Sequence, residues 1–263
     1  MAVLAIDIGN TRMGLGLFRN GVAEDPAVRL THAELDGELP KTLQTLWEKA
    51  NCQGADAEED CEIIVASVVP EVSRRVLAVA RDTLDKKPRQ AGQDFPVPLK
   101  TMLRDESTVG VDRLLGALAA YVNTQVACAI VSVGSALVVD CIDQEGIFRG
   151  GAIAPGLAMS AKALHEYAAQ LPAASLTPPD QPFGRFTQEA INVGLYVGAR
   201  GAVRELLERY ATALGGWPHV VATGGDALTL LQDLQLVDSF IPDLVLQGAA
   251  LAWEHYQRSQ MQA

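Results

Sequence analysis

A short pattern that occurs twice, about half the chain apart, constrains the fold of this sequence more than any other feature. An apolar stretch runs into a small or acidic residue, then a glycine, then a hydroxyl side chain, at Asp7-Ile8-Gly9-Asn10-Thr11 and again at Ser132-Val133-Gly134-Ser135. Short apolar runs that end in turn residues are typical of buried strands. The offset of 125 residues between Asp7 and Ser132 therefore predicts two related α/β halves, which we divide into segments 1–112 and 113–263.

Size and charge narrow the possible functions. The chain has 263 residues, enough for two domains, and its net charge is −11. A negative field of this size repels polyanions and anionic lipid surfaces, so we expect no nucleic-acid partner and no membrane partner. The longest apolar run, 127–139, is shorter than the about 18 residues that a spanning helix needs. The first residues show no secretory signal, so we expect a cytoplasmic protein.

The cysteines and histidines indicate no metal centre. The four cysteines form no CxxC pair, and no histidine has a partner at metal-ligand spacing. We therefore expect reduced, packed thiols, and histidines that are structural or exposed. The residues concerned are Cys52, Cys61, Cys128, Cys141, His32, His165, His219 and His255.

The hydrophobic pattern predicts alternating strands and helices. Apolar runs predict strands over 3–6, 13–18, 62–69, 127–133, 137–142 and 219–222. Helical spacing predicts helices that begin at Pro70 and Arg113, and further helices over 157–170, 187–214 and 248–257. The glycine-rich segment 148–156 and the proline-rich segment 171–185 are expected to be loops.

Asp7 and the residues that follow it suit a phosphate site. Gly9 lets a ligand approach the backbone closely, and Asn10 and Thr11 offer side-chain donors. The Asp7 carboxylate suits a hydrated divalent cation beside phosphates, and Arg12 supplies positive charge that this acidic chain otherwise lacks. The same residues also fit an ordinary hairpin loop, and the segment alone does not decide between the two.

Gly110-Val111-Asp112-Arg113 places an acid and an arginine at the expected start of a helix. The pair fits a helix cap with a solvated ion pair. It also fits Asp112 as a general base and Arg113 as an anion clamp, roles suited to a kinase that acts on a small anionic alcohol. Thr223-Gly224-Gly225 fits either a simple turn or a contact with the ribose or adenine of a nucleotide.

Taken in order, these segments of the chain resemble those of the type III pantothenate kinases, members of the acetate and sugar kinase, Hsp70 and actin superfamily. They span residues 7 to 227 and are Asp7-Ile8-Gly9-Asn10-Thr11, Ser67-Val68-Val69-Pro70, Gly110-Val111-Asp112-Arg113, Gly134-Ser135-Ala136, Gly150-Gly151-Ala152-Ile153-Ala154-Pro155-Gly156 and Thr223-Gly224-Gly225. The resemblance implies duplicated actin-like ATPase (ribonuclease H-like) α/β domains with a cleft between them. It also implies ATP-dependent phosphorylation of pantothenate to 4'-phosphopantothenate, the first step of coenzyme A biosynthesis.

The resemblance also implies roles for particular residues. It makes Asp112 the proton acceptor, and Asp7 the residue that holds Mg²⁺ through water. The residues implied to bind ATP are Asp7, Ile8, Gly9, Asn10, Thr11, Arg12, Gly134 and Ser135. Those implied to bind pantothenate are Gly110, Val111, Asp112, Arg113 and Thr187. Such kinases are generally homodimers that need ATP, a divalent metal and a monovalent cation, K⁺ or NH₄⁺.

Two positions depart from the family pattern. Ser132 stands where an aspartate usually helps to hold the monovalent cation, and Leu103 stands where a substrate-contacting tyrosine is common. Asp140 partly compensates for Ser132 if the strand pair folds back at Gly134-Ser135. These departures leave open a non-catalytic nucleotide-binding regulator derived from this family, or a kinase of the same superfamily that acts on another small alcohol or acid.

Overall fold

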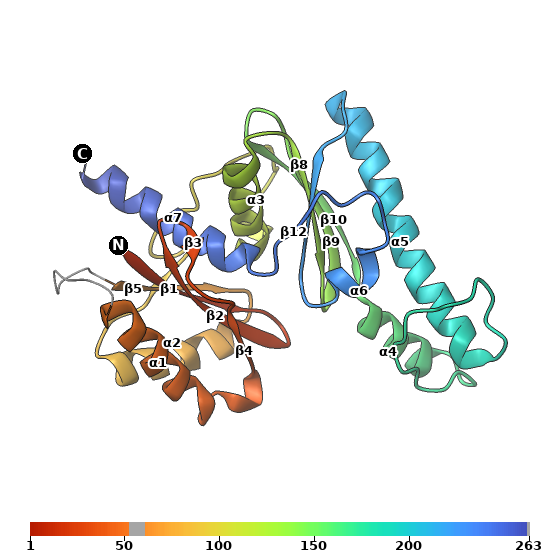
Figure 1. Cartoon of the computed structure of the whole chain (residues 1–263), viewed down its shortest axis with the longest axis horizontal. Helices are drawn as coiled ribbons and strands as arrows, with labels where there is room; N and C mark the ends of the chain where they lie inside the picture. Colours follow the sequence, from red (N-terminus) through yellow and green to blue (C-terminus); the bar gives the residue numbers. More distant parts are fainter. Residues whose placement is uncertain (53–60, 262–263) are drawn as a thin grey trace. The chain divides into compact units, whose positions relative to one another are not determined.

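The computed structural model describes residues 1–52 and 61–261, without the side chains of residues 51 and 52, and divides into two compact units (Figure 1). Unit 1 consists of Met1–Lys100, Arg104–Val122 and Asp243–Ala263, and unit 2 consists of Thr101–Leu103 and Asn123–Pro242. Each unit is built on its own mixed β-sheet.

The sheet of unit 1 has β1 near its centre. Its strands are β1 (Ala2–Ile8), β2 (Arg12–Arg19), β3 (Val22–Ala23), β4 (Val28–Thr31), β5 (Cys61–Ser67) and β6 (Arg89–Gln90). Their order is β3-β2-β1-β5-β6, and β4 also pairs with β2. Strand β1 runs antiparallel to β2 and parallel to β5. The turn between β2 and β3 has positive φ at Asn20 and Gly21, as the Asn-Gly pair predicts.

Helices pack on both faces of this sheet because successive side chains of β1 point to opposite sides. On one face, Leu4 and Ile6 are buried with Leu39 of α1 (Glu38–Cys52) and Val76 of α2 (Pro70–Leu84). On the other face, Val3 and Ala5 are buried with residues of α3 (Val111–Thr124) and α7 (Leu244–Met261). Short 3₁₀ helices span His32–Glu34 and Glu106–Thr108. The hydrophobic pattern of the sequence does not predict α1.

The sheet of unit 2 repeats the central arrangement of unit 1. Its strands are β7 (Lys100–Thr101), β8 (Cys128–Val133), β9 (Ala136–Ile142), β10 (Ile147–Pro155), β11 (His219–Thr223) and β12 (Ser239–Phe240), in the order β12-β11-β8-β9-β10-β7. Strand β8 runs antiparallel to β9 and parallel to β11, just as β1 does to β2 and β5. Helices α4 (Leu157–Tyr167), α5 (Thr187–Leu214) and α6 (Ala227–Leu231) complete the unit. Residues of all three helices share a buried cluster with Val131 and Val133 of β8.

Helices α3 and α7 make the two units differ from the expected segments 1–112 and 113–263. Leu115 and Leu118 of α3, and Trp253 of α7, are buried in the same cluster as Val3 of β1. A Cβ atom at Gly248 would collide with the carbonyl group of Leu115, so the glycine allows the two helices to approach closely. Both helices therefore belong to unit 1, although they follow residue 112 in the chain.

The glycine-rich segment 148–156 is a strand for most of its length, so the predicted loop is wrong. Gly150 has φ of +91° and lies at a register shift in the pairing of β10 with β9, which marks a β-bulge. Gly151 lies opposite Asp140, and a Cβ atom there would collide with the Asp140 carboxylate and the Val139 carbonyl. These glycines therefore serve a bulge and a close approach within the sheet.

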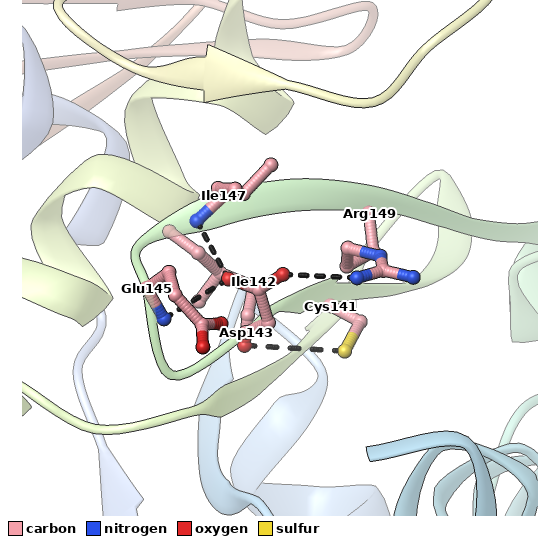
Figure 2. Close-up of polar contacts among 6 residues, drawn as sticks. All are labelled: Cys141, Ile142, Asp143, Glu145, Ile147 and Arg149. Atoms are coloured by element: carbon pink, nitrogen blue, oxygen red, sulfur yellow. Dashed lines mark hydrogen bonds and ion pairs between the residues drawn. The ribbon is translucent and has the colours of Figure 1, made fainter.

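The turn that joins β9 to β10 is organised by one buried acid, Asp143 (Figure 2). Its carboxylate accepts hydrogen bonds from the N–H groups of Glu145 (3.1 Å) and Ile147 (2.9 Å) and from Nη1 of Arg149 (3.0 Å). Burial acts to raise the pKa of Asp143, but these hydrogen bonds outweigh it and the pKa is lowered. Asp143 is thus a fully partnered structural acid.

The cysteines within the described residues are packed thiols, as expected. Cys61, Cys128 and Cys141 are buried and form no disulfide, and burial raises the pKa of each thiol. The side chain of Cys52 lies outside the described residues. In the part of the chain that the structure describes, no three His, Cys, Asp or Glu side chains gather as a metal site would require.

Candidate functional site

Asp7 lies near the carboxyl end of β1, on the face that α3 and α7 cover. Its neighbours Ile6 and Ile8 are fully buried on the opposite face, so the alternation of the strand turns the Asp7 carboxylate toward the helices. The side chain is partly buried. A carboxylate at the end of a central strand and beside a turn is well placed to meet a ligand.

The turn after β1 exposes the side chains that the sequence singles out. Its backbone is fixed by a hydrogen bond from the N–H of Gly9 to the carbonyl of Arg12 (3.0 Å). Asn10, Thr11 and Arg12 are exposed and follow this turn into β2. His32 reaches the same turn, because its Nε2 lies 3.0 Å from the Gly9 carbonyl oxygen. The histidine is therefore structural, as expected, and it supports the candidate phosphate turn.

Asp112 lies in the first turn of α3, also within unit 1. Its Oδ1 accepts a hydrogen bond from the N–H of Arg113 (2.9 Å), so the acid does bond to the start of the helix as a cap would. A Cβ atom at Gly110 would collide with this carboxylate, which explains the glycine two residues earlier. The Gly110 position also lies beside Val68, which follows β5. The four residues Gly110 to Arg113 therefore lie together in unit 1.

Asp7 and Asp112 are close enough for their charges to interact. Burial and the negative charge of Asp112 together raise the pKa of Asp7 to about 7, although the positive charge of Arg29 opposes both. Burial also raises the pKa of Asp112, while the N–H and the charge of Arg113 hold it back. Asp143 shows that this chain lowers the pKa of an acid that it fully partners. Raised pKa values at neighbouring acids are typical of functional sites, which makes Asp7 and Asp112 the candidate pair.

The chemistry of this pair fits a divalent cation. Mg²⁺ prefers oxygen ligands and is commonly held by one or two carboxylates together with substrate phosphates and waters. Two partly desolvated carboxylates that repel each other are stabilised by a positive ion between them or beside them. Asp7, with the negative charge of Asp112 nearby, therefore suits the divalent cation that the sequence led us to expect there.

In unit 2, backbone contacts hold the turn that carries the second copy of the repeated pattern. The N–H of Gly134 donates to the carbonyl of Ala136 (3.0 Å), which closes the turn between β8 and β9. The N–H of Gly156 donates to the carbonyl of Ser135 (3.1 Å). Gly224, with φ of +97°, lies so close to Val133 that a Cβ atom would collide with its backbone. The Thr223-Gly225 segment is thus a turn that packs beside the second loop.

Ser132 and Asp140 share a face of the unit 2 sheet but do not converge. The strand pair folds back at Gly134-Ser135 as expected, with Ser132 opposite Val138 and Asp140 opposite Ile130. The Asp140 carboxylate, however, lies over Gly151 of β10, on the far side of β9 from Ser132. Asp140 is therefore poorly placed to replace the carboxylate that Ser132 lacks.

Two further predicted positions lie elsewhere in unit 2. Leu103 follows β7, and its side chain packs against the bulge at Gly150. Thr187 is the first residue of α5 and is exposed. Within unit 2, neither belongs to the turn around Gly134 and Gly224.

The sequence patterns did not predict two charged residues as part of the site, Arg29 and Asp243. Arg29 of β4 and Asp243, which precedes α7, form an ion pair within unit 1. The sequence held one signal for them, the strand glycines Gly14 and Gly16, because glycine within a strand marks a close approach. A Cβ atom at Gly14 would collide with the Arg29 guanidinium.

Comparison with known proteins gives matches along nearly the whole chain. The family model of the type III pantothenate kinases matches residues 3–209. The type III pantothenate kinase of Dehalococcoides mccartyi strain 195 is 33% identical over 256 residues, which cover 97% of this chain and 98% of the relative. The type III pantothenate kinase of Moorella thermoacetica is 30% identical over 256 residues, which cover 96% and 98%. That of Persephonella marina is 29% identical over 250 residues, which cover 94% and 96%.

Two solved structures share the fold. A protein described as a Baf family transcriptional activator from Campylobacter jejuni aligns with a TM-score of 0.60 and 18% identity, over 97% of this chain and 99% of that one. The activator of the 2-hydroxyisocaproyl-CoA dehydratase from Clostridium difficile, with bound ADPNP, aligns with a TM-score of 0.54 and 15% identity, over 100% and 98%. At these identities the likeness concerns the fold alone, and the expected actin-like α/β class is confirmed.

Proposed function

Because this chain belongs to the type III pantothenate kinase family, we propose that it transfers the γ-phosphoryl group of ATP to the primary hydroxyl of pantothenate. The products are 4'-phosphopantothenate and ADP, in the first step of coenzyme A biosynthesis. The observation that carries this proposal is the Asp7–Asp112 pair, found within a chain that aligns over 97% of its length with a named kinase. The curated relatives compared above are all named as kinases, and the alternative of a non-catalytic regulator rests on Ser132 and Leu103 alone.

Asp112 is suited to accept the proton of the pantothenate hydroxyl. Burial raises the pKa of its carboxyl group, and a base with a pKa closer to neutral accepts a proton more readily. As the hydroxyl oxygen bonds to the γ-phosphorus, its proton passes to Asp112 and the bond to the β-phosphate oxygen breaks. Phosphoryl transfer depends mainly on positioning and charge stabilisation, and Arg113 supplies positive charge beside Asp112 for the anionic substrate.

The two turns of the repeated pattern are assigned to ATP. Asp7, Ile8, Gly9, Asn10, Thr11 and Arg12 would bind phosphate on unit 1, and Gly134 and Ser135 would bind nucleotide on unit 2. The exposed side chains of Asn10 and Thr11 and the backbone of Gly9 support the first assignment. Gly110, Val111, Asp112 and Arg113 would bind pantothenate, together with Thr187.

Two cations and a second subunit complete the proposal. Asp7 would hold Mg²⁺ through water, and this ion would neutralise charge on the phosphates. A monovalent cation, K⁺ or NH₄⁺, would lie near Ser132 and be held weakly there, because a hydroxyl group brings no negative charge. We further propose a cytoplasmic homodimer. Among the described residues, no helix is both long and apolar enough to cross a membrane.

An assay of the purified protein tests the proposed function directly. The protein is incubated with pantothenate, ATP and Mg²⁺ in separate K⁺ and NH₄⁺ buffers, and 4'-phosphopantothenate and ADP are quantified. We expect both products in equal amounts, well above an enzyme-free control. Absence of product in both buffers contradicts the proposal. Consumption of another small alcohol or acid in a substrate panel, with pantothenate left intact, would instead identify a related kinase.

A further inference from the structure

Three neighbouring strands of unit 1 place an acid, a glycine and an arginine in one row. Asp7 of β1 lies directly opposite Gly14 of β2, and Gly14 lies directly opposite Arg29 of β4. Residues directly opposite each other project from the same face of a sheet. Since Gly14 has no side chain, the side chains of Asp7 and Arg29 face each other across it.

The guanidinium group of Arg29 fills the space above Gly14. A Cβ atom built at Gly14 would collide with Nη1 of Arg29, so any larger residue would displace this group. Burial and Asp112 raise the pKa of Asp7 while the positive charge of Arg29 lowers it, which agrees with a guanidinium close to the carboxylate. The strand register and the position of the guanidinium group above Gly14 therefore both place the Arg29 side chain on the side of Asp7.

Asp243 holds Arg29 from the other side. Its Oδ1 accepts a hydrogen bond from Nη2 of Arg29, and its Oδ2 accepts one from the N–H of Ala27 (3.3 Å). Asp243 is also the first residue of the segment with which the chain returns to unit 1, directly before α7. The acid is therefore tied both to the strand end and to the helix that covers the Asp7 face.

This ion pair is poorly suited to a purely stabilising role. The Arg29 side chain is 41% exposed and that of Asp243 is 21% exposed. Ion pairs at such exposure contribute about 0–1 kcal/mol to stability. A glycine in the middle of a strand also weakens the strand. Gly14 lowers the stability of the strand and the ion pair adds little stability, so the arrangement is better explained by a functional role than by a structural one.

We propose that Arg29 is a positioning residue, which Asp243 holds over Gly14 so that it fixes the Asp7 carboxylate for the nucleotide and its Mg²⁺. This inference rests on the proposed function only in that Asp7 serves the nucleotide. Residues that orient a ligand of a metal commonly change metal affinity or activity by about 10–100-fold when they are removed. The positive charge that acts on Asp112 comes from Arg113 and not from Arg29.

Binding of ATP in the presence of Mg²⁺, measured by calorimetry, tests the inference without any need for turnover. We expect Arg29→Ala to raise the Kd about 10–100-fold. Arg29→Lys, which restores the charge, should recover part of this loss, and guanidinium ions added at millimolar concentration should improve binding by Arg29→Ala but not by the wild type. The KM for pantothenate should stay within twofold, a split that general misfolding would not produce.

Gly14→Ala and Gly16→Ala form a matched pair on one strand. The added methyl group at position 14 collides with Arg29, whereas at position 16 it meets the ring of Phe18 at 3.0 Å and apolar atoms of Ala27 and Leu246 at 3.6 Å. Gly14→Ala should weaken nucleotide binding as Arg29→Ala does, and Gly16→Ala should leave it near the wild-type value. Equal effects of the two substitutions would overturn the inference.

The remaining outcomes are also decisive. A Kd for Arg29→Ala within twofold of the wild type overturns the inference, as does failure of both Arg29→Lys and guanidinium to recover binding. If the wild type binds ATP with Mg²⁺ but forms no 4'-phosphopantothenate, the proposed function fails while the role of Arg29 is still measured. If the wild type binds no nucleotide, Arg29 has nothing to position and the inference fails too.

Discussion

The turn after β1 and the turn after β8 have the same strand surroundings but different chemistry. Each joins an antiparallel strand pair, and each first strand also has a parallel neighbour. In unit 1 the last residue but one of the strand is Asp7, whose charge interacts with Asp112 and Arg29. In unit 2 the corresponding residue is Ser132, which lies opposite Val138 and Thr223. The two units thus share the arrangement of their central strands, but the acid pair lies in unit 1.

The two turns also differ in what surrounds them. Asn10, Thr11 and Arg12 of the first turn are exposed. The second turn is covered by backbone, since Gly156 donates to Ser135 and Gly224 packs on Val133. The first turn therefore exposes polar and charged side chains, whereas the second turn is closed by contacts between backbone groups. Each prediction below sets one turn against the other.

The largest contrast should come from removing the proposed base. Asp112→Asn keeps the shape of the side chain but cannot accept the hydroxyl proton, so we expect kcat to fall by about 10²–10⁴-fold. Ser132→Ala removes a polar group at the equivalent end of the unit 2 pattern and should change kcat only severalfold. Steady-state kinetics of both variants at saturating ATP and pantothenate measure the difference. Similar losses in the two variants would mean that unit 2 takes part in the chemistry as much as unit 1.

A second contrast concerns the glycines of the two turns. Gly224→Ala puts a methyl group into the backbone of Val133 and forces φ of +97° on a residue with a side chain. Such strained positions cost about 1–3 kcal/mol each. At Gly9 the added Cβ would lie 3.4 Å from the Arg12 carbonyl oxygen, an ordinary contact. Urea unfolding followed by circular dichroism should therefore show a clear loss for Gly224→Ala and little change for Gly9→Ala.

The third contrast concerns how the unfolding free energy depends on pH, because Asp7 titrates and Ser132 does not. The pKa of Asp7 rises from 3.8 to about 7 on folding, so the folded protein holds a proton that the unfolded chain has lost between pH 4 and 7. The unfolding free energy therefore falls as the pH rises through this range. Asp7→Asn removes the effect, and in metal-free buffer it should gain stability over the wild type from pH 4 to 7.5.

The expected size of this gain is limited by exposure. A rise of the Asp7 pKa from 3.8 to about 7 corresponds to about 4 kcal/mol, and solvent screening of this partly exposed carboxylate reduces it to about 1–2 kcal/mol. Chemical denaturation at several pH values measures it, with Ser132→Ala as the pH-independent control. A parallel pH dependence in wild type and Asp7→Asn would show that Asp7 titrates normally.

Local signals explain which parts of the fold the sequence could predict. The Asn20-Gly21 turn, Pro70 at the start of α2 and the helix over 187–214 each follow from a few adjacent residues, and all three are found. The strand β10 was missed because its glycines look like a loop. Their purpose lies in Asp140 and Leu103, which only the folded sheet brings beside them.

The candidate site shows the same division. Asp7 and Asp112 stood out because each lies beside a recognisable turn or helix start, but their proximity depends on α3 packing on the face of β1 that carries Asp7. Arg29 carries no motif at all. Its relation to Asp7 exists only through the register of three strands, and a register cannot be read from one strand alone.

The smallest expected effect concerns the monovalent cation and turns the comparison around by giving unit 2 the charge that it lacks. Ser132→Asp places a carboxylate at the end of β8, as Asp7 does at the end of β1. Two unit charges 4 Å apart in water attract by about 1 kcal/mol, which corresponds to about fivefold in affinity. We therefore expect weak stimulation of the wild type by K⁺, and about fivefold tighter K⁺ activation in Ser132→Asp, measured as initial rate against K⁺ concentration at constant ionic strength. Ser132→Asn is the uncharged control and should behave like the wild type.

Because Asp140 lies over Gly151 on the other side of β9, it should not mask the difference. A strong, saturable K⁺ requirement in the wild type would show that another group already holds the cation.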